Sequence, residues 1–599
     1  MNVTLHEMIL DGPADRIAIE AIGRTPLSRD ALLDQVDAAA ATLRSLGLGP
    51  RDTVAVVLPN GPEMATAFLA TAIAGISAPL NPAYRRDEFA FYLADLDARL
   101  LIIGEEMASP ARDVARERGI PIVELGTPPD ASAGVFMLNG NIPRLALPIH
   151  PEPDATALVL HTSGTTARPK LVPLSHRNLT VSAAQIARAL ALTPTDRCLN
   201  VMPLFHIHGL MAALVASLHA GGSVVCSPGF LSPRFFGWLR DCRPTWYTAV
   251  PTMHQAILRR AADPESEAAI TAGRLRFIRS SSASLPVRTL EELEATFRVP
   301  VIEAYGMTEA AHQMASNPLP PGRRKPGSVG IAAGPEVAVM DREGSLLPQG
   351  AIGEVVIRGP AVTAGYVNNP EANARAFTDG WFRTGDEGAL DGDGYLTLTG
   401  RLKEQINRAG EKISPLEVDG VLTSHPAVAQ ALTFSVAHPI LGEDVAAVVV
   451  LKPGATVVER ALREFVAARL AYFKVPHQIL QVDSIPTGPT GKFQRIGLAE
   501  RLGVVAIVPV DDQDRTRPRT ATEEIVAQIW GEVLGRPALG VRQNFFALGG
   551  DSVLATRLVA QVRQRLAVEL ALFAFFDAPS IEGIAAAIDL LLEAEGADA

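Results

Sequence analysis

The sequence predicts an α/β protein: a large layered core, a more β-rich part, a small α+β part and an all-helical C-terminal unit. Strand-like and helix-like segments alternate from residue 27 to about 100, and the alternation returns after residue 170, which is typical of parallel sheets covered by helices. Residues 326–400 are richer in strand-like runs, and helical spacing dominates beyond residue 520. At 599 residues the chain is too long for one core, so we expect two to four domains.

The core elements are expected in a regular order. A helix-like stretch at 31–46 precedes a strand-like run at 53–58. A second, apolar helix is expected at about 62–74, followed by a strand signal that ends at 100–103. After residue 170, the expected elements are helices around 178–192 and 209–220 and strands at 223–226 and 275–278.

Composition and charge exclude several classes of function. The hydrophobic fraction of 48% and the charged fraction of 20% are those of an ordinary globular protein, and the net charge of −11 argues against a nucleic-acid partner. The three cysteines form no C-x-x-C pair, so we expect buried thiols in a reducing compartment rather than disulfides or zinc ligands. Neither a secretion signal nor an apolar run of membrane-spanning length is evident. We therefore expect a cytoplasmic enzyme without a membrane partner.

The chain is organised around a polar run at 161–170. It follows a buried-strand pattern at 157–160, and its small residues allow the backbone to curl round an anion while offering amide and hydroxyl donors. Lys170 adds a mobile positive charge, but the spacing is not the Walker pattern, because Lys170 lies six residues after Gly164 and precedes Leu171. A flexible surface loop is the alternative. The small residues of the run are Thr162, Ser163, Gly164, Thr165 and Thr166.

A second run downstream suits a nucleotide base and a metal ion. A strand that ends in the small residues 280–284 leaves room for a flat base, and Tyr305 can stack on it. Thr308 can donate to a phosphoryl oxygen, and Glu309 offers a hard carboxylate oxygen to Mg²⁺. The alternative is a strand followed by a turn with one surface acid.

Together, the run at 161–170 and the string Tyr-Gly-Met-Thr-Glu at 305–309 resemble two motifs of the adenylate-forming (ANL) superfamily. That superfamily includes acyl-CoA synthetases, luciferases and the adenylation domains of peptide synthetases, and the motifs are its phosphate loop and its adenine and magnesium motif. This chain departs from many members at Ala167 and Leu171, which replace glycines.

The resemblance implies ATP and Mg²⁺ as cofactors and assigns roles to particular residues. The implied magnesium ligands are Glu309 and Thr165, and the implied catalytic residues are Lys492, Thr308, Glu309 and Lys170. The implied nucleotide-binding residues are Thr162, Ser163, Gly164, Thr165, Thr166, Ser282, Ala283, Ser284, Glu303, Ala304, Tyr305, Gly306, Met307, Thr308, Asp386 and Arg401.

Further motifs extend the resemblance to a hinge and a lid. Asp386, which ends the string Trp-Phe-Arg-Thr-Gly-Asp, can accept both ribose hydroxyls, although Gly-Asp alone is an ordinary turn. Arg401 matches the family's second ribose contact, and Lys403 falls where the family has its hinge. Lys492 lies on a Gly/Pro-rich turn, where a lysine is usually a solvated tip. It matches the family's catalytic lysine, which would stabilise charge on the carboxylate and the α-phosphate.

A polar, charge-dense linker without an apolar period precedes the C-terminal unit. The string Asn-Phe-Phe-Ala-Leu-Gly-Gly-Asp-Ser at 544–552 would, by itself, be an N-cap for the next helix. It also resembles the attachment site of acyl and peptidyl carrier domains, where Ser552 would bear 4′-phosphopantetheine added by a phosphopantetheinyl transferase. The expected divisions are the adenylation core at 1–402, the lid at 403–500, the linker at 501–519 and the carrier domain at 520–599.

Three histidines and one serine bear on the substrate acid. Amino-acid-activating members usually have an aspartate where this chain has His206, so an α-amino acid is not expected. Several strings, including 246–254 and 308–312, resemble the oxalyl-CoA synthetase branch. This implies a small polar pocket for a dianion, whose far end needs hydrogen-bond donors. The implied substrate-binding residues are His206 or His208, Ser282 and His312.

The expected function is ATP-dependent adenylation of oxalate or another short polar acid. Pyrophosphate would be released, and the acyl group would pass to the phosphopantetheine thiol on Ser552. A separate acyl-accepting biosynthetic enzyme is expected to take the acyl group, because no condensation, reductase or thioesterase segment fits within this length. One alternative is an acyl-CoA synthetase that forms a free CoA thioester, with an accessory carrier. Another is a passive carrier fused to a dead nucleotide-binding domain, which the presence of Lys492, Glu309 and Asp386 disfavours.

Overall fold

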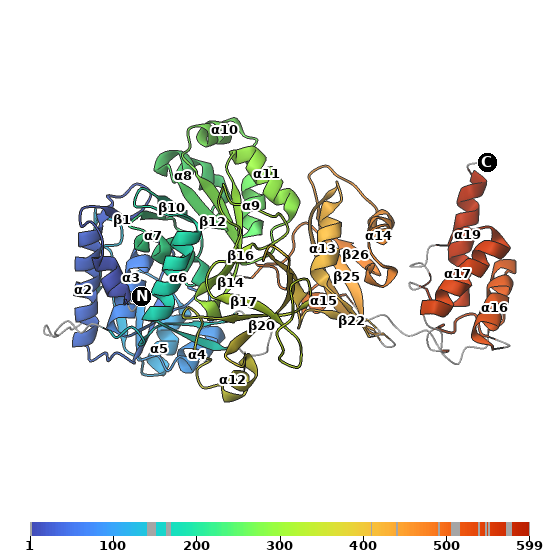
Figure 1. Cartoon of the computed structure of the whole chain (residues 1–599), viewed down its shortest axis with the longest axis horizontal. Helices are drawn as coiled ribbons and strands as arrows, with labels where there is room; N and C mark the ends of the chain where they lie inside the picture. The colour runs from blue at the N-terminus through green and yellow to red at the C-terminus, as the bar shows by residue number, and fades with distance from the viewer. Residues whose placement is uncertain are drawn as a thin grey trace. The chain divides into compact units, whose positions relative to one another are not determined.

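The computed structural model of the chain divides into two units. The first contains Met1–Leu398 together with Thr487–Lys492, and the second contains Thr399–Pro486 and Phe493–Ala599. Figure 1 shows the first unit from blue to yellow-green and the second in orange and red. The structure describes residues 3–139, 151–162, 169–408, 410–438, 441–488, 492–504, 516–536, 539–545, 548, 552–570, 575 and 578–597.

One sheet of the first unit flanks the predicted phosphate loop. In pairing order its strands are β7 (Met137–Asn139), β6 (Ile122–Gly126), β5 (Leu100–Gly104), β3 (Thr53–Val57), β4 (Ile76–Pro79), β8 (Thr156–His161) and β9 (Leu171–Ser175). The strands from β6 to β8 are parallel, and β3 and β5 are continuous apolar runs because both faces are covered. β9 pairs antiparallel to β8, so the run at 161–170 lies in the connection between them.

The second sheet of this unit carries most of the predicted base and acid residues. In pairing order its strands are β16 (Ile331–Ala332), β15 (His312–Ser316), β14 (Val301–Met307), β13 (Phe277–Ser281), β12 (Trp246–Ala249), β10 (Arg197–Asn200), β11 (Ser223–Cys226), β1 (Ile17–Glu20) and β2 (Leu27–Ser28). The strands from β14 to β1 are parallel, so the carboxyl ends of β12, β13 and β14 meet at one edge. Ligands bind preferentially at such an edge.

Two helices are buried between these sheets. α3 (Pro62–Ala74) contacts β4 and β11, and α6 (His176–Ala189) contacts β9 and β15, so each helix touches both sheets. Every residue of α3 except Glu63 is buried, which explains why the sequence shows an apolar helix without a polar face. The main hydrophobic core of the unit therefore lies between the two sheets.

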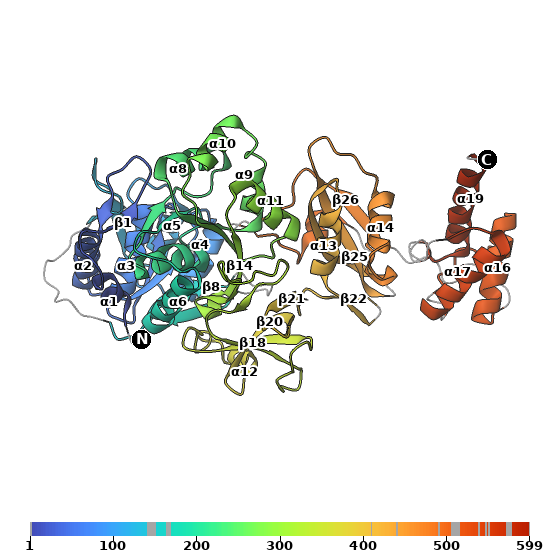
Figure 2. The same cartoon turned by 45° about the horizontal axis from the view of Figure 1, so that its top comes forward.

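Further helices cover the outer face of the nine-stranded sheet. They are α8 (Phe235–Cys242), α9 (Pro251–Leu258), α10 (Pro264–Thr271) and α11 (Val287–Phe297), which lie together in both views (Figure 2). A second core forms where Tyr247 and Ile278 of the strands meet Phe235 and Leu293 of these helices. Further helices of the unit include α1 (Leu5–Leu10), α2 (Arg29–Ser45), α4 (Arg86–Asp95), α5 (Pro110–Glu117) and α12 (Pro370–Ala376), with the short turns η2 (Ser232–Arg234) and η3 (Thr308–Ala310).

Two expected elements differ in detail from the sequence prediction. The helix expected at 209–220 is a π-helix, η1 (His208–Val215), continued by α7 (Ala216–His219). The strand expected at 275–278 begins two residues later and continues to Ser281. Apolar patterning misses its end because Arg279 and the serines that follow it are polar residues buried inside the sheet.

The predicted β-rich part forms an antiparallel sheet of its own. In pairing order its strands are β17 (Glu336–Met340), β18 (Gly353–Arg358), β20 (Trp381–Leu390) and β19 (Phe377–Thr378). Val356 and Trp381 are buried in a small core on this sheet. β21 (Leu396–Arg401) follows and spans the boundary between the two units.

The lid in the second unit is an α+β body, as expected. In pairing order its strands are β23 (Glu411–Ile413), β22 (Ile406–Arg408), β25 (Gly442–Leu451) and β24 (Val428–His438), with β26 (Gln478–Gln481) parallel to β25. Its helices are α13 (Pro415–Ser424), α14 (Glu459–Ala467) and α15 (Leu498–Arg501), with the turn η4 (Tyr472–Lys474). β25 is buried on both faces. Successive residues of a strand point to opposite faces, and Val448 and Val449 belong to different cores.

The C-terminal part is helical and has a core of its own. Its described helices are α16 (Ala521–Leu534), α17 (Ser552–Leu566) and α19 (Ile581–Ala597). The rings of Trp530, Phe545 and Phe575 meet at its centre, with centroids 4.8 to 6.0 Å apart. Among the helices of the described residues, none combines the length and the apolar character needed to cross a membrane.

Candidate functional site

Five polar side chains form a cluster at the carboxyl ends of the central strands. His208 opens η1, and Thr248 of β12 lies directly beside Arg279 of β13. Ser282 follows β13, and His312 opens β15, which pairs with the end of β14. All but Ser282, which is half-buried, are almost fully buried. We call these five residues the acid cluster.

The imidazole of His208 is held on both ring nitrogens. Its Nδ1 lies 3.0 Å from Oγ of Ser282, and its Nε2 lies 2.6 Å from Oγ1 of Thr248. Nη1 of Arg279 approaches both the Nε2 and the Oγ1 at 3.4 Å, while Nη2 donates to Oε1 of Gln313 at 3.2 Å. Among the described residues, Nε of Arg279 has no hydrogen-bond partner and the guanidinium has no ion pair with a carboxylate.

His312 completes the cluster from the neighbouring strand. Its ring stacks on that of His208, with centroids 4.9 Å apart and an interplanar angle of 22°. Its Nε2 has no hydrogen-bond partner among the described residues, so a buried polar atom is left to interact with a ligand. The backbone of His312 has a φ of +99° and approaches Gly306, where a Cβ would lie 1.5 Å from the His312 carbonyl oxygen. Glycine at 306 is therefore required by the packing of β14 against β15.

The electrostatics of the cluster favour neutral histidines beside one buried cation. Burial lowers the pKa of His208 and His312 well below the usual value, and the positive charge of Arg279 lowers both further. The pKa of His206 is lowered to about 3, mainly by burial and to a smaller extent by the positive charge of Lys492. Burial also lowers the pKa of Arg279 to about 9, so the guanidinium remains charged at neutral pH. The cluster is thus a desolvated site that offers hydrogen-bond donors and one positive charge.

Two hydrogen-bonded pairs contain predicted nucleotide and magnesium residues. The phenol of Tyr305 donates to Oδ2 of Asp386 at 2.5 Å, and both side chains are buried. Glu309 in η3, directly after Thr308, accepts a hydrogen bond of 3.0 Å from the phenol of Tyr366. These contacts bring the predicted base, ribose and magnesium residues into the same unit as the acid cluster.

Other predicted nucleotide residues line the ends of β13 and β14. Ala283 and Ser284 are exposed, and Ser282 has a φ of +74°. Glu303 is different, because its Oε1 accepts from the backbone N–H of Leu285 at 2.9 Å and its buried Oε2 has no partner among the described residues. Burial raises the pKa of Glu303 to about 8. The remaining predicted members on β14 are Ala304, Gly306 and Met307, of which Ala304 is buried and the other two are half-buried.

Two hydrogen bonds join the two ends of the predicted phosphate loop. The N–H of Thr162 donates to the carbonyl of Lys170 at 2.9 Å, and the N–H of Lys170 donates to Oγ1 of Thr162 at 3.1 Å. The ammonium of Lys170 lies over the ring of Tyr366, 4.3 Å from its centroid. The loop members Ser163, Gly164, Thr165 and Thr166 lie outside the described residues.

The predicted lid and carrier residues belong to different parts of the chain. Lys492 belongs to the first unit by its contacts, and its charge lowers the pKa of His206, as noted above. Arg401 ends β21 and Lys403 follows it; both are exposed and belong to the second unit. Ser552 is the first residue of α17.

Three residues of this site received no role from sequence reasoning. Arg279 and Thr248 complete the acid cluster, and Tyr366 connects Glu309 with Lys170. The signal that could have indicated Arg279 was a charged residue directly after an apolar strand pattern. Such a residue is rarely buried unless it has a partner or binds a ligand. No comparable local signal marks Thr248 or Tyr366.

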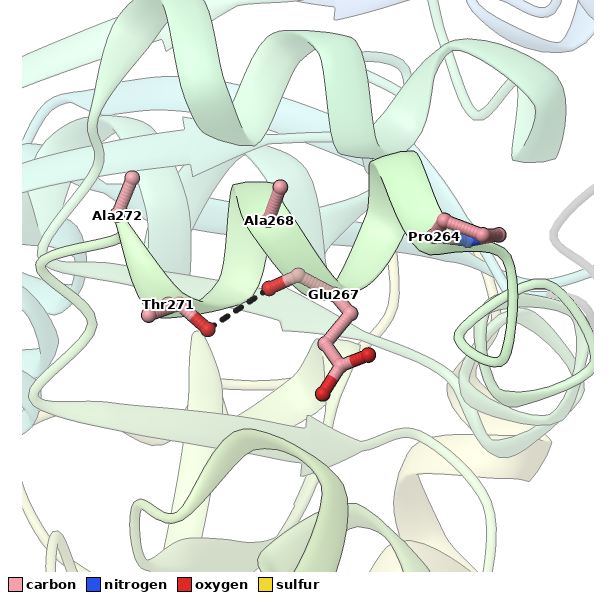
Figure 3. Close-up of a pocket in the computed structure, with 5 residues that line it drawn as sticks. All are labelled: Pro264, Glu267, Ala268, Thr271 and Ala272. Carbon is pink, nitrogen blue, oxygen red and sulfur yellow. Dashed lines mark hydrogen bonds between the residues drawn. The ribbon is translucent and has the colours of Figure 1, made fainter.

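A hollow on the surface of α10 offers no comparable chemistry. Figure 3 shows its five lining residues, which all come from α10 and the residue that follows it. All are exposed, and the Thr271 hydroxyl already donates to the backbone carbonyl of Glu267 at 2.9 Å. The five residues are Pro264, Glu267, Ala268, Thr271 and Ala272.

The donor set fits the ligands that the motifs imply. The carboxylate of Glu309 is the kind of hard oxygen ligand that Mg²⁺ prefers, and a phenol already orients it. The Asp386 carboxylate suits ribose hydroxyls as an acceptor. The unpartnered Nε2 of His312 and Nε of Arg279 suit an acid with two anionic groups. Mg²⁺ would neutralise charge on the phosphates of ATP there.

Three family models match the chain. A model described as AMP-binding enzyme matches residues 9–367, and one described as AMP-binding enzyme C-terminal domain matches residues 417–492. A model described as phosphopantetheine attachment site matches residues 524–588.

Individual known proteins are also similar to the chain. It is 45% identical over 490 residues to an oxalate–CoA ligase of Arabidopsis thaliana, covering 80% of this chain and 94% of that protein. It is 40% identical over 456 residues to a sulfoacetate–CoA ligase of Cupriavidus necator, covering 76% and 88%. Among solved structures, ATP-bound MatB from Rhodopseudomonas palustris superimposes with a TM-score of 0.76 at 30% identity, covering 84% of this chain and 99% of that one.

The matched models cover the two large sheets, most of the lid and the helical C-terminal part, in the order in which they occur along the chain. The expected adenylation residues up to Glu309 lie within the first model and Lys492 lies within the second, whereas Asp386 and Arg401 lie between the two; Ser552 lies within the third. The chain belongs to the AMP-binding enzyme family of AMP-forming, ATP-dependent acid–thiol ligases, and it carries a phosphopantetheine-attachment domain behind the C-terminal domain of that family.

Proposed function

We propose that the protein converts oxalate, or a similarly short acid with two anionic groups, to its acyl-adenylate and then loads it on its own carrier domain. The observation that carries the choice of acid is the acid cluster, in which buried donors surround a cation without a carboxylate partner among the described residues. A second anionic group would satisfy the unpartnered Nε2 of His312 and compensate the charge of Arg279.

A fatty acid would interact poorly with this cluster. Its tail would offer no hydrogen bond to the hydroxyl of Ser282 or to Nε2 of His312, and each unsatisfied buried polar group costs about 1–3 kcal/mol. The names of two relatives agree with the choice, because oxalate and sulfoacetate are both small acids with two anionic groups. Selectivity for a short dianion thus follows from the cost of leaving the cluster unpaired.

The chemistry proceeds through a mixed anhydride because a carboxylate has no good leaving group. A carboxylate oxygen of the acid bonds to the α-phosphorus of ATP, the bond from that phosphorus to the bridging oxygen breaks, and pyrophosphate leaves. The charge of Lys492, whose effect extends to His206, would stabilise the negative charge that develops on the carboxylate and the α-phosphate. Glu309, oriented by Tyr366, would hold the Mg²⁺ that accompanies the phosphates.

The acyl acceptor is the second part of the proposal. The thiol of phosphopantetheine on Ser552 would replace AMP at the carbonyl carbon, with loss of the thiol proton, and its tether would give a high effective concentration. A phosphopantetheinyl transferase must first modify Ser552, and a separate biosynthetic enzyme would take the loaded acyl group. A free CoA thioester is the second candidate, because the relatives named above are CoA ligases.

Mass spectrometry of the phosphopantetheinylated protein tests both parts. After incubation with Mg-ATP and a panel of acids, we expect an oxalyl adduct on the Ser552 peptide and none from a long-chain fatty acid. Ser552→Ala should abolish loading while ATP–pyrophosphate exchange continues. Loading of the fatty acid without oxalate would overturn the proposed substrate. Accumulation of oxalyl-CoA with an unacylated Ser552 peptide would overturn self-loading and support the CoA ligase.

A further inference from the structure

We propose that Arg279 and Thr248 are positioning residues that fix the tautomer of His208, so that the hydroxyl of Ser282 presents its hydrogen to the second anionic group of the substrate. This inference rests on the proposed function, since it concerns how the acid cluster recognises that group. The role proposed here for Arg279 and Thr248 acts through His208 and is separate from any direct attraction between the Arg279 charge and the acid.

Arg279, Thr248, His208 and Ser282 form a chain of hydrogen bonds, which we call the relay. Arg279 determines the direction of the hydrogen bonds at its own end of this chain. A guanidinium can only donate, so Oγ1 of Thr248 and Nε2 of His208, both 3.4 Å from Nη1, face a donor. The hydroxyl of Thr248 can then use its own hydrogen for the 2.6 Å contact with Nε2. Nε2 is therefore the acceptor nitrogen of the imidazole.

The proton of a neutral His208 must consequently lie on Nδ1. That nitrogen is 3.0 Å from Oγ of Ser282, so it donates and Ser282 accepts. The hydroxyl hydrogen of Ser282 is then not used by His208 and is available to a ligand oxygen. With the opposite tautomer, Ser282 would donate to Nδ1 and present only lone pairs to an anionic group, which is repulsive.

Two further observations support a fixed relay. Arg279 is anchored on its other side by Oε1 of Gln313, and the Gln313 amide is oriented by its donation to the carbonyl of Ala333 at 2.9 Å. Burial and the charge of Arg279 lower the pKa of His208, which keeps the imidazole in the neutral form that the relay requires. Burial also makes the relay costly to reverse, because every member must keep a partner.

A pair of substitutions at Thr248 separates the effect of the hydroxyl from that of side-chain volume. Thr248→Val removes the hydroxyl and is nearly isosteric, whereas Thr248→Ser retains it. We expect Thr248→Val to raise the KM for oxalate about tenfold or more, the effect of losing a hydrogen bond to a charged group, with the KM for ATP unchanged. Thr248→Ser should restore most of the affinity. Thr71→Val is the matched control, because it removes another fully buried threonine hydroxyl, in α3, whose partners lie outside the cluster.

Substitution of Arg279 tests the charge as well as the relay. We expect Arg279→Met to lower the ratio of kcat/KM for oxalate to that for glyoxylate, which has one anionic group and similar size, about tenfold or more. A purely structural role would instead lower activity with both acids and both cosubstrates equally. Equal KM values for Thr248→Val and Thr248→Ser, or an unchanged acid ratio in Arg279→Met, would overturn the inference. If the wild-type protein uses no short dianion at all, it is the proposed function that fails.

Discussion

The phenol of Tyr366 donates a hydrogen bond of 3.0 Å to the carboxylate of Glu309, and its ring lies beneath the ammonium of Lys170. Burial raises the pKa of Tyr366, and the negative charge of Glu309 raises it further. The phenol therefore stays protonated and remains a donor. One side chain thus contacts both the predicted magnesium ligand and the predicted phosphate lysine.

Tyr366→Phe should weaken the use of Mg²⁺ without affecting the acid. The phenylalanine keeps the ring under Lys170 but leaves Glu309 without the phenol, so we expect the Mg²⁺ concentration for half-maximal ATP–pyrophosphate exchange to rise about three- to tenfold. Tyr395→Phe is the matched control, because that phenol donates to the backbone carbonyl of Arg323. An identical Mg²⁺ dependence in Tyr366→Phe and Tyr395→Phe would contradict a role for the phenol.

Glu303 should make stability depend on pH in the range in which its protonation differs between the folded and unfolded states. Burial raises its pKa from 4.5 to about 8 in the folded protein. Between these values the unfolded chain loses the proton that the folded chain retains, so the Glu303 contribution to the free energy of unfolding falls as pH rises and is constant above pH 8.

Glu303→Gln removes this titration and isolates its effect. The free energy of unfolding of the variant relative to the wild type should rise by roughly 3–5 kcal/mol between about pH 4.5 and pH 8, measured by denaturant unfolding in a pH series. The same difference at both ends of that range would show that Glu303 is ionised in the folded state.

Local sequence patterns predicted the elements that bury apolar faces. The continuous runs of β3 and β5 and the all-apolar α3 appear where expected, because burial on both sides removes the polar alternation that would otherwise mark a surface. The apolar pattern of β13 ends at Ile278, since a pattern based on hydrophobicity cannot include Arg279, and the expectation of a strand that ends in small residues rested on residues 280–284 instead.

The sequence motifs predicted some residues of the candidate site but not the residues that support them. Ser282 and His312 were expected at the substrate because each belongs to a string that resembles one family branch, and His208 because its segment borders the acyl pocket in adenylating enzymes. Their support was not predicted, since the contacts of Arg279 with Thr248 and of Tyr366 with Glu309 join residues 31 and 57 positions apart in the sequence. The first pair arises from the register of β12 with β13, and the second joins the turn η3 to a residue outside the helices and strands; local spacing encodes neither.

Gly306→Ala should disrupt the acid cluster through the backbone. A Cβ at this position would lie 1.5 Å from the carbonyl oxygen of His312, so β15 must shift and carry the His312 ring away from His208. We expect a lower melting temperature and a KM for oxalate raised more than the KM for ATP. Gly237→Ala is the control, because nothing lies within 4 Å of a Cβ at this site in α8. Unchanged oxalate kinetics in Gly306→Ala would show that the position of His312 is not critical.

Lys492→Ala should separate the two half-reactions. The charge of Lys492 lowers the pKa of His206, His208 and His312, so it acts where the acid is expected to bind. Charge stabilisation matters while the carboxylate attacks the phosphorus, and we expect ATP–pyrophosphate exchange to fall about 10²- to 10³-fold. Thioester formation from a synthetic acyl-adenylate should change much less, because the phosphorus chemistry is already complete. Lys474→Ala, which removes a lid lysine paired with Glu417, should leave both half-reactions unchanged. An equal loss in both half-reactions of Lys492→Ala would instead assign the lysine to the integrity of the fold.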